Sequence, residues 1–246
     1  MTNKSNLDLS VPTFPRGVWP KRSPALSADQ LEIARDFMHY WQTVLPQKYR
    51  ALEKFNHEYP LRQLPEVSEA KTLEIGAGLG EHLHYENKKN QMYFCNEIRA
   101  DFAATIERNY SDVRTIVGDC QEKLPVEDNF FDRVIAIHVL EHLNNLPIAL
   151  DEIHRTMKPG GFFNIVIPCD PGFMYELARK FSTERIFKKR YKLPYRWWIR
   201  REHINSPSEI LAELSSRFRI LDKTFFPFVL PLVHLNICIG VTGMKV

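Results

Sequence analysis

The stretch Thr72-Leu73-Glu74-Ile75-Gly76-Ala77-Gly78-Leu79-Gly80 decides the fold class of this 246-residue chain. It begins as a short apolar strand and continues directly into glycines at alternate positions. Glycine lets the backbone turn sharply and lets a ligand approach with no side chain in between. A helix that starts after such a loop offers free N–H groups and positive potential to that ligand. Glycine-rich turns also occur without a ligand, so the loop alone leaves both interpretations open.

Apolar runs and helix-like segments alternate from this loop onward. We predict strands at residues 72–75, 91–96, 113–117, 131–137 and 161–167. Helical patterns lie between them at 99–109 and 146–157. This alternation predicts an α/β fold, in which helices cover both faces of a parallel sheet. The chain ends in a predicted helix at 208–215 and two strands at about 219–225 and 234–242.

A carboxylate after the second predicted strand narrows the choice of ligand. Glu97 lies 21 residues after Gly76, close to the spacing of an acid that binds ribose hydroxyls. The spacing G-x-G-x-G differs from the G-x-G-x-x-G of dinucleotide sites. Glu74, two residues before the first glycine, would repel a pyrophosphate and suits the cationic methionine end of S-adenosylmethionine.

The motifs together resemble those of class I S-adenosylmethionine-dependent methyltransferases, of the type 11-like group related to ubiquinone-biosynthesis and small-molecule enzymes. The matching segments, in the order of the family, are residues 73–80, 96–98, 118–120, 130–134 with 139–143, and 158–161. The resemblance implies a Rossmann-like, seven-stranded, mostly parallel sheet with an antiparallel last strand. It also implies S-adenosylmethionine as the cofactor.

The resemblance assigns the cofactor contacts residue by residue. The methionine end of the cofactor would be lined by Glu74, Gly76, Ala77 and Gly78, and its sulfonium would lie over His138. Glu97 would hold the ribose hydroxyls. The adenine would pack on Ile98 and contact Asp119 and Cys120. We name His203 and His142 as candidate catalytic residues, because a hydroxyl acceptor needs a base and histidine has a suitable pKa.

A basic and aromatic segment follows the fifth predicted strand. Residues 173–203 carry ten Lys or Arg and three acids, a net charge of +7, although the whole chain carries only +3. We interpret this segment as a lid over a small anionic, glycan-linked or lipid-linked acceptor that is methylated on oxygen or nitrogen. The alternatives are an RNA-modifying or RNA-binding protein, a peripheral contact with an anionic membrane through Trp197 and Trp198, and a non-catalytic cofactor-binding partner.

These patterns divide the chain into four parts. They are an N-terminal arm and helical cap at 1–60, the cofactor-binding core at 61–172, the basic insert at 173–207, and a C-terminal helix and strands at 208–246. A capping-box pattern at Ser27 and Gln30 starts the helix of the cap, which we expect to pack over the cofactor cleft. A second helix is expected at 47–57.

The cysteines and the apolar stretches of the sequence bear on metal binding, disulfide bonds, location and membrane insertion. The four cysteines form no C-x-x-C pair, so we expect neither a metal site nor a disulfide framework, and we expect a reducing, cytoplasmic location. The N-terminus lacks the apolar run of a signal peptide. Prolines and polar residues interrupt the most apolar stretch, 225–241, so we expect no transmembrane segment.

Overall fold

A seven-stranded sheet forms the centre of the computed structural model, which describes residues 7–44 and 49–246, without the side chains of 41–44. The strands are β1 (Ala70–Ile75), β2 (Gln91–Glu97), β3 (Val113–Val117), β4 (Phe131–Ile137), β5 (Met157–Pro168), β6 (Arg219–Phe226) and β7 (Cys238–Met244). Their order across the sheet is β3-β2-β1-β4-β5-β7-β6. The first five strands are parallel, and β7 is antiparallel to both of its neighbours. The predicted fold class is confirmed.

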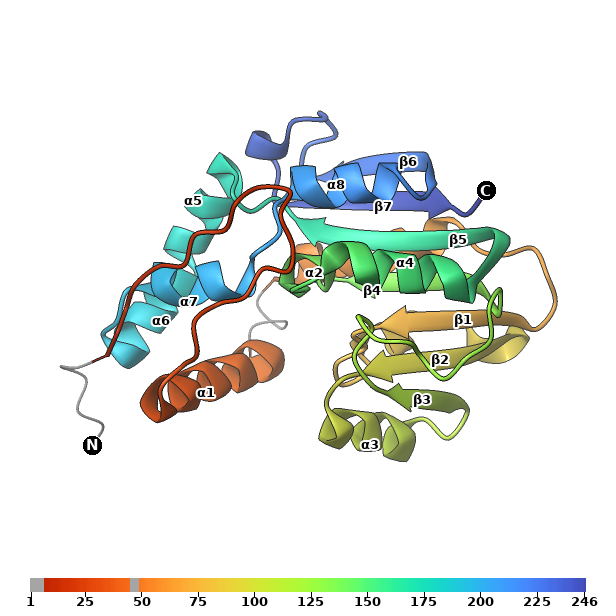
Figure 1. Ribbon diagram of the computed structural model, residues 1–246, viewed down its shortest axis with the longest axis horizontal. Helices are drawn as coiled ribbons and strands as arrows, with labels where there is room; N and C mark the ends of the chain where they lie inside the picture. Colours follow the sequence, from red (N-terminus) through yellow and green to blue (C-terminus); the bar gives the residue numbers. More distant parts are fainter. Residues whose placement is uncertain (1–6, 45–48) are drawn as a thin grey trace.

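Helices cover both faces of this sheet (Figure 1). The α-helices are α1 (Ala28–Val44), α2 (Arg50–Glu58), α3 (Ala100–Asn109), α4 (Leu146–Thr156), α5 (Phe173–Phe181), α6 (Thr183–Tyr191), α7 (Tyr195–Glu202) and α8 (Pro207–Ser215). The short 3₁₀ helices are η3 (Tyr59–Arg62), η4 (Glu81–His84), η5 (Lys88–Asn90), η6 (Leu140–His142) and η7 (Val233–Leu235). Among the described residues, no helix is long and apolar enough to cross a membrane.

Alternate side chains of the parallel strands enter two separate apolar cores. Leu73 of β1 and Val134 of β4 pack in the core that α4 and α8 cover. The neighbouring Cys95 and Ile135 point to the other face and pack with Ile106 of α3. Successive side chains of a strand face opposite ways, so strands buried on both sides are apolar throughout. This is why the strand positions could be read from the sequence.

The segment after the glycine loop does not form the expected α-helix. It forms only η4, four residues of 3₁₀ helix that begin after Gly80. A few residues further on, Glu86 turns inward, where its carboxylate accepts hydrogen bonds from Arg133 at 2.8 Å and Gln91 at 2.8 Å. His82 Nε2 lies 3.0 Å from the same carboxylate. This buried polar cluster fixes the segment against the sheet, which a regular helix would not permit.

The last strand starts later than the sequence pattern suggested. The predicted strand at 234–242 is in fact β7, which begins at Cys238, because η7 occupies Val233–Leu235. Asn236 explains the difference. Its side chain donates to the carbonyl oxygens of Leu230 and Leu232 and accepts from the N–H of Phe228, and so it holds the β6–β7 connection in an irregular shape.

The insert folds into helices α5–α7, which lie with α1 beyond the carboxyl ends of the parallel strands (Figure 1). The predicted capping box starts α1, since Ser27 N–H donates to Gln30 Oε1 at 2.8 Å. Phe37 of α1 packs edge-on against Trp198 of α7, with ring centroids 4.9 Å apart. Trp197 and Trp198 are buried in this aromatic core, so the suggestion that they contact a membrane is wrong. The start of the predicted helix at 47–57 lies outside the described residues; its remainder is α2.

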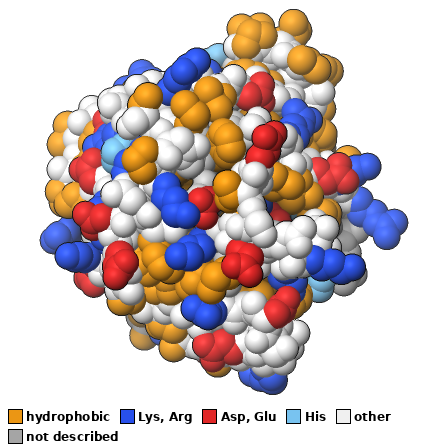
Figure 2. Space-filling view, turned by 90° about the vertical axis from the view of Figure 1, so that its right-hand side faces the viewer, with side chains coloured by type: hydrophobic (Ala, Val, Ile, Leu, Met, Phe, Trp, Pro, Cys, Tyr) orange, Lys and Arg blue, Asp and Glu red, His pale blue; other side chains and the backbone are white. Residues whose placement is uncertain are grey.

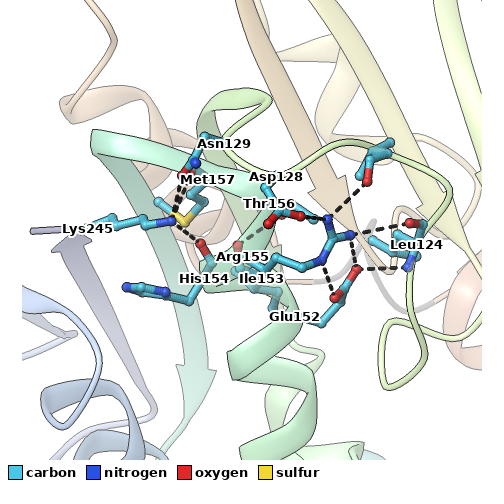
Figure 3. A network of polar contacts seen from close by, with 11 residues as sticks. Leu124, Asp128, Asn129, Glu152, Ile153, His154, Arg155, Thr156, Met157 and Lys245 are labelled. Atoms are coloured by element: carbon cyan, nitrogen blue, oxygen red, sulfur yellow. Dashed lines mark hydrogen bonds and ion pairs between the residues drawn. The ribbon is translucent and has the colours of Figure 1, made fainter.

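The end of the sheet away from the insert is held by polar contacts (Figure 3). Lys245 donates to the carbonyl oxygens of His154 and Met157 at 2.8 and 2.9 Å, and so satisfies orphan carbonyls at the end of α4. Arg155 forms a two-pronged ion pair with Glu152. Positive and negative side chains are interspersed on this side of the molecule (Figure 2), as on an ordinary solvated surface. The positively charged insert, residues 173–203, lies at the opposite end of the molecule (Figure 1).

Candidate active site at the carboxyl ends of the strands

The glycine loop lies at the carboxyl end of β1, between the ends of β2 and β4. Gly76 has φ +65°, and a Cβ atom at this position would lie 2.6 Å from Cγ2 of Val139. A side chain is therefore excluded both by backbone strain and by the close approach of the β4–α4 connection. The N–H of Ala77 donates to the carbonyl oxygen of Asn96 at 3.1 Å, which ties the loop to the end of β2.

The Glu97 carboxylate lies directly against this loop. Its Oε2 accepts a hydrogen bond from the N–H of Gly78 at 2.9 Å, and its Oε1 accepts one from the N–H of Arg99 at 3.0 Å. The pairing of Ile75 with Asn96 across β1 and β2 places the two segments side by side. An acid fixed beside a glycine loop fits the ribose hydroxyls of an adenosyl group.

The next predicted contacts surround the same strand end. Ile98 is 63% exposed, which leaves an apolar surface open beside Glu97. Asp119 accepts a hydrogen bond from the N–H of Gln121 at 2.9 Å, and Cys120 is buried. Asn96, which sequence reasoning did not single out, donates to the carbonyl oxygens of Ile116 and Gly118 and so holds this turn in place. The polar and apolar groups present fit the ribose and adenine of the cofactor.

Glu74 lies beneath the loop, within the sheet. It is 4% exposed, and the hydroxyl of Tyr93 donates to its Oε2 at 3.0 Å. Burial raises the pKa of Glu74 to about 8, although the hydrogen bond from Tyr93 opposes this rise. The side chain is consequently protonated near neutral pH.

His138 lies at the end of β4 and contacts Glu141. The residue has φ +54°, and its N–H donates to the carbonyl oxygen of Val166 at 2.9 Å. Its Nδ1 lies 3.3 Å from Oε1 of Glu141, which is 1% exposed. Burial disfavours the Glu141 carboxylate, yet the neighbouring imidazoles outweigh burial and lower its pKa to about 2. Glu141 is thus a charged group at the centre of the site that sequence reasoning did not identify.

The two candidate catalytic histidines come together at this point, although they are far apart in the sequence. The ring centroids of His142 and His203 are 5.2 Å apart. His203 Nδ1 lies 2.9 Å from Oδ2 of Asp170, a buried residue just after β5. Burial opposes ionisation of Asp170, but its hydrogen bond with His203 lowers its pKa below the ordinary value. The position of Asp170 at a strand end was the signal that could have identified it.

Main-chain hydrogen bonds hold the two histidine-bearing segments together. The N–H groups of Ile204 and Asn205 both donate to the carbonyl oxygen of Glu141, at 2.9 and 3.1 Å. The Asn205 side chain donates to the carbonyl oxygens of Leu140 and Leu143. The segment that follows α7 is therefore fixed against the β4–α4 connection, and the positions of His142 and His203 are rigidly defined.

A cavity of about 630 Å³ opens beside His203. The N-terminal arm, α7, the start of α8 and the β6–β7 connection contribute its walls. Lys21 is neutralised there by Glu209, with 2.6 Å between Nζ and Oε1. Arg16, Arg196 and Arg200 give the cavity a positive character.

Comparisons with known proteins identify the cofactor-binding part of the chain. Residues 73–165 match the family described as "Methyltransferase domain". The sterol 4-C-methyltransferase strm-1 of Caenorhabditis elegans is 33% identical over 104 residues, which are 41% of this chain and 28% of that protein. The human mitochondrial arginine-hydroxylase NDUFAF5 is 35% identical over 95 residues, 37% of this chain and 26% of that protein. The chain thus spans only about a quarter of the length of these two relatives.

Solved structures agree with this result at the level of the fold. A protein from Pyrococcus horikoshii superposes with a TM-score of 0.62 at 17% identity, over 85% of this chain and 99% of that one. The family match, the strand order with its antiparallel β7, and the site at the ends of β1 and β2 lead to one conclusion. The chain contains a class I S-adenosylmethionine-dependent methyltransferase domain, matched over residues 73–165.

Proposed function

We propose that this protein transfers a methyl group from S-adenosylmethionine to an oxygen or nitrogen atom of a small, anionic acceptor. The observation that carries this proposal is the position of the cavity. Arginines 16, 196 and 200 line it, and His203 forms part of its wall, close to Glu141 and His142. Guanidinium groups pair well with carboxylate and phosphate, so an anionic acceptor would be held with its nucleophilic atom near the histidines.

Methyl transfer depends mainly on how the acceptor atom is positioned relative to the methyl carbon. The acceptor atom attacks the sulfonium-activated methyl carbon, the new bond to carbon forms as the carbon–sulfur bond breaks, and the electron pair stays on sulfur. The chain must align the acceptor, exclude water and remove a proton from a hydroxyl acceptor. The N-terminal arm supports this role, because it lines one side of the cavity and is held to α8 by the Arg16–Ser208 hydrogen bond and the contact of Gly17 N–H with Glu209.

Two alternatives have less support. An RNA-binding surface needs exposed aromatic rings for stacking. The insert exposes Phe173 and Phe181, but its Tyr191, Tyr195, Trp197 and Trp198 are buried. A cofactor-binding partner without catalysis would not require histidines and carboxylates gathered beside a positive cavity. The similarity to an arginine hydroxylase covers only 37% of this chain and 26% of that protein, so the reaction is inferred here from the site itself.

Cofactor binding and turnover test the proposal separately. S-adenosylmethionine should raise the melting temperature and NAD should not; stabilisation by NAD alone would refute the cofactor assignment. Small carboxylates and phosphates are then screened as acceptors through release of S-adenosylhomocysteine. We expect His203→Ala to lower kcat by about 100-fold or more with little change in cofactor affinity. Arg200→Ala should mainly raise KM for the acceptor. Tight, saturable binding of structured RNA at moderate salt would favour the alternative.

A further inference from the structure

Three side chains beside the cavity have the composition of a metal site. One ligand atom from each of Glu141, His142 and His203 lies within 4.8 Å of the other two. A first-row divalent ion binds nitrogen and oxygen at about 2.1 Å, so its ligands lie roughly 3–3.5 Å from one another. Side-chain rotations that move each ligand atom by about 1 Å would close the present arrangement around an ion.

The two imidazoles are oriented as metal ligands usually are. His203 Nδ1 lies 2.9 Å from the Asp170 carboxylate, and His142 Nδ1 lies 2.8 Å from the carbonyl oxygen of Glu202. Both acceptors take the N–H of the imidazole on Nδ1 and leave a lone pair on Nε2. Metal-bound histidines characteristically donate their other N–H to a carboxylate or a carbonyl in this way. His142 Nε2 then lies 3.7 Å from Oε1 of Glu141.

Glu141 supplies an oxygen that lacks a protein partner. Its Oε1 contacts His138, while its Oε2 is buried and has no hydrogen-bond partner among the residues that the structure describes. Leaving a buried carboxylate oxygen unsatisfied is costly, and such groups in native structures usually have a bound ion or water. The main-chain bonds from Ile204 and Asn205 to the Glu141 carbonyl oxygen hold the backbone of Glu141 beside the segment that carries His203.

We propose that Glu141, His142 and His203 bind a divalent transition-metal ion, with Asp170 and the Glu202 carbonyl orienting the two histidines. Two imidazoles and one carboxylate suit Zn²⁺, Mn²⁺ or Fe²⁺ and leave coordination positions open. This inference rests on the proposed function and deepens it, because His203 also lines the acceptor cavity. An acceptor hydroxyl bound there loses its proton to water more readily, and the resulting oxygen attacks the methyl carbon. The cysteine pattern could not reveal such a site, and the expectation of no metal was drawn from cysteines alone.

Metal binding is measured first, without cofactor or acceptor. Zn²⁺, Mn²⁺ and Mg²⁺ are titrated separately by calorimetry into the full chain after treatment with a chelator. We expect one ion per chain, with Zn²⁺ and Mn²⁺ binding more tightly than Mg²⁺. Glu141→Gln should weaken binding by at least about 100-fold, and Asp170→Asn, which acts through His203, by about 10–100-fold. His84→Ala, which removes an exposed imidazole elsewhere, is the control and should leave binding unchanged.

Each outcome decides between the two proposals. Absence of saturable binding to the wild type, or equal binding by wild type and Glu141→Gln, overturns the metal site. Circular dichroism of each variant shows whether a loss of binding is a loss of fold; for a variant that fails to fold, His142→Ala replaces it in the titration. Methyl transfer that continues at full rate after removal of metal overturns the role of the metal in the reaction and leaves the proposed function intact. Metal binding at these residues without turnover of any acceptor refutes the proposed function alone.

Discussion

Glu74→Gln tests the energetic consequence of placing a carboxyl group inside the sheet. The carboxyl is 4% exposed, and burial raises its pKa from an ordinary 4.5 to about 8. Between these two values, Glu74 is protonated in the folded chain and ionised in the unfolded chain. The folded state therefore binds one proton more, so its free energy of unfolding decreases as the pH rises.

The size of the effect follows from this difference in pKa. Each pH unit between about 5 and 8 lowers the free energy of unfolding by up to about 1.4 kcal/mol, and the total approaches about 5 kcal/mol at pH 8. Below pH 4.5 the group is protonated in both states and contributes no penalty. Glutamine has a similar shape, accepts the hydrogen bond from Tyr93 and does not titrate, so this part of the pH dependence should disappear.

Urea denaturation followed by circular dichroism measures this difference. Wild type and Glu74→Gln are compared without cofactor at pH 5.5, 6.5, 7.5 and about 8.5, a range set by the two pKa values. The stability of the variant relative to wild type should increase steadily up to pH 8 and then level off. Glu127→Gln, which removes an exposed carboxyl, should keep the wild-type dependence. A difference between wild type and Glu74→Gln that stays constant over this range would refute the reasoning.

Four further substitutions test the fold and the cofactor site. Phe37→Ala should destabilise the chain by about 3–5 kcal/mol, because it empties the aromatic core between α1 and the insert; a loss below about 1 kcal/mol in urea titration would contradict this packing. Gly240→Ala should cost about 1–3 kcal/mol or more by the same measurement, because its Cβ would lie 2.5 Å from the buried ring of Tyr59; wild-type stability would show that the ring can move. Glu97→Ala and Asp119→Ala should each weaken S-adenosylmethionine binding by about 10–100-fold in calorimetry; unchanged affinity in both would disprove the cofactor map.

The sheet and the cofactor loop could be predicted because their signals are local. A strand buried on both faces must be apolar along its whole length, and β4 was found at residues 131–137 as predicted. Three glycines at the end of β1 mark a turn that other residues could not make, and Glu97 follows at the spacing that a βαβ unit imposes. The order of these motifs was sufficient to indicate the class I methyltransferase fold.

Local patterns failed where distant groups compete for the same segment. The residues after Gly80 were expected to start an α-helix, but the buried ion pair of Glu86 with Arg133 leaves only a short 3₁₀ helix. The insert looked like an exposed basic and aromatic surface. Four of its rings instead pack against Phe37, because α1 offers an apolar partner that is distant in the sequence; they are those of Phe187, Tyr191, Tyr195 and Trp198.

The sequence by itself determined the succession of strands and helices along the chain, the glycine loop and the acid that faces it, because each depends on a few neighbouring residues and a fixed spacing. It also named His142 and His203, but it could not relate them. Only the tertiary structure brought these histidines to Glu141 and Asp170, because the ends of β4 and β5 and the segment after α7 meet at one edge of the sheet. These long-range contacts depend on packing and main-chain hydrogen bonds, which produce no periodic pattern in the sequence.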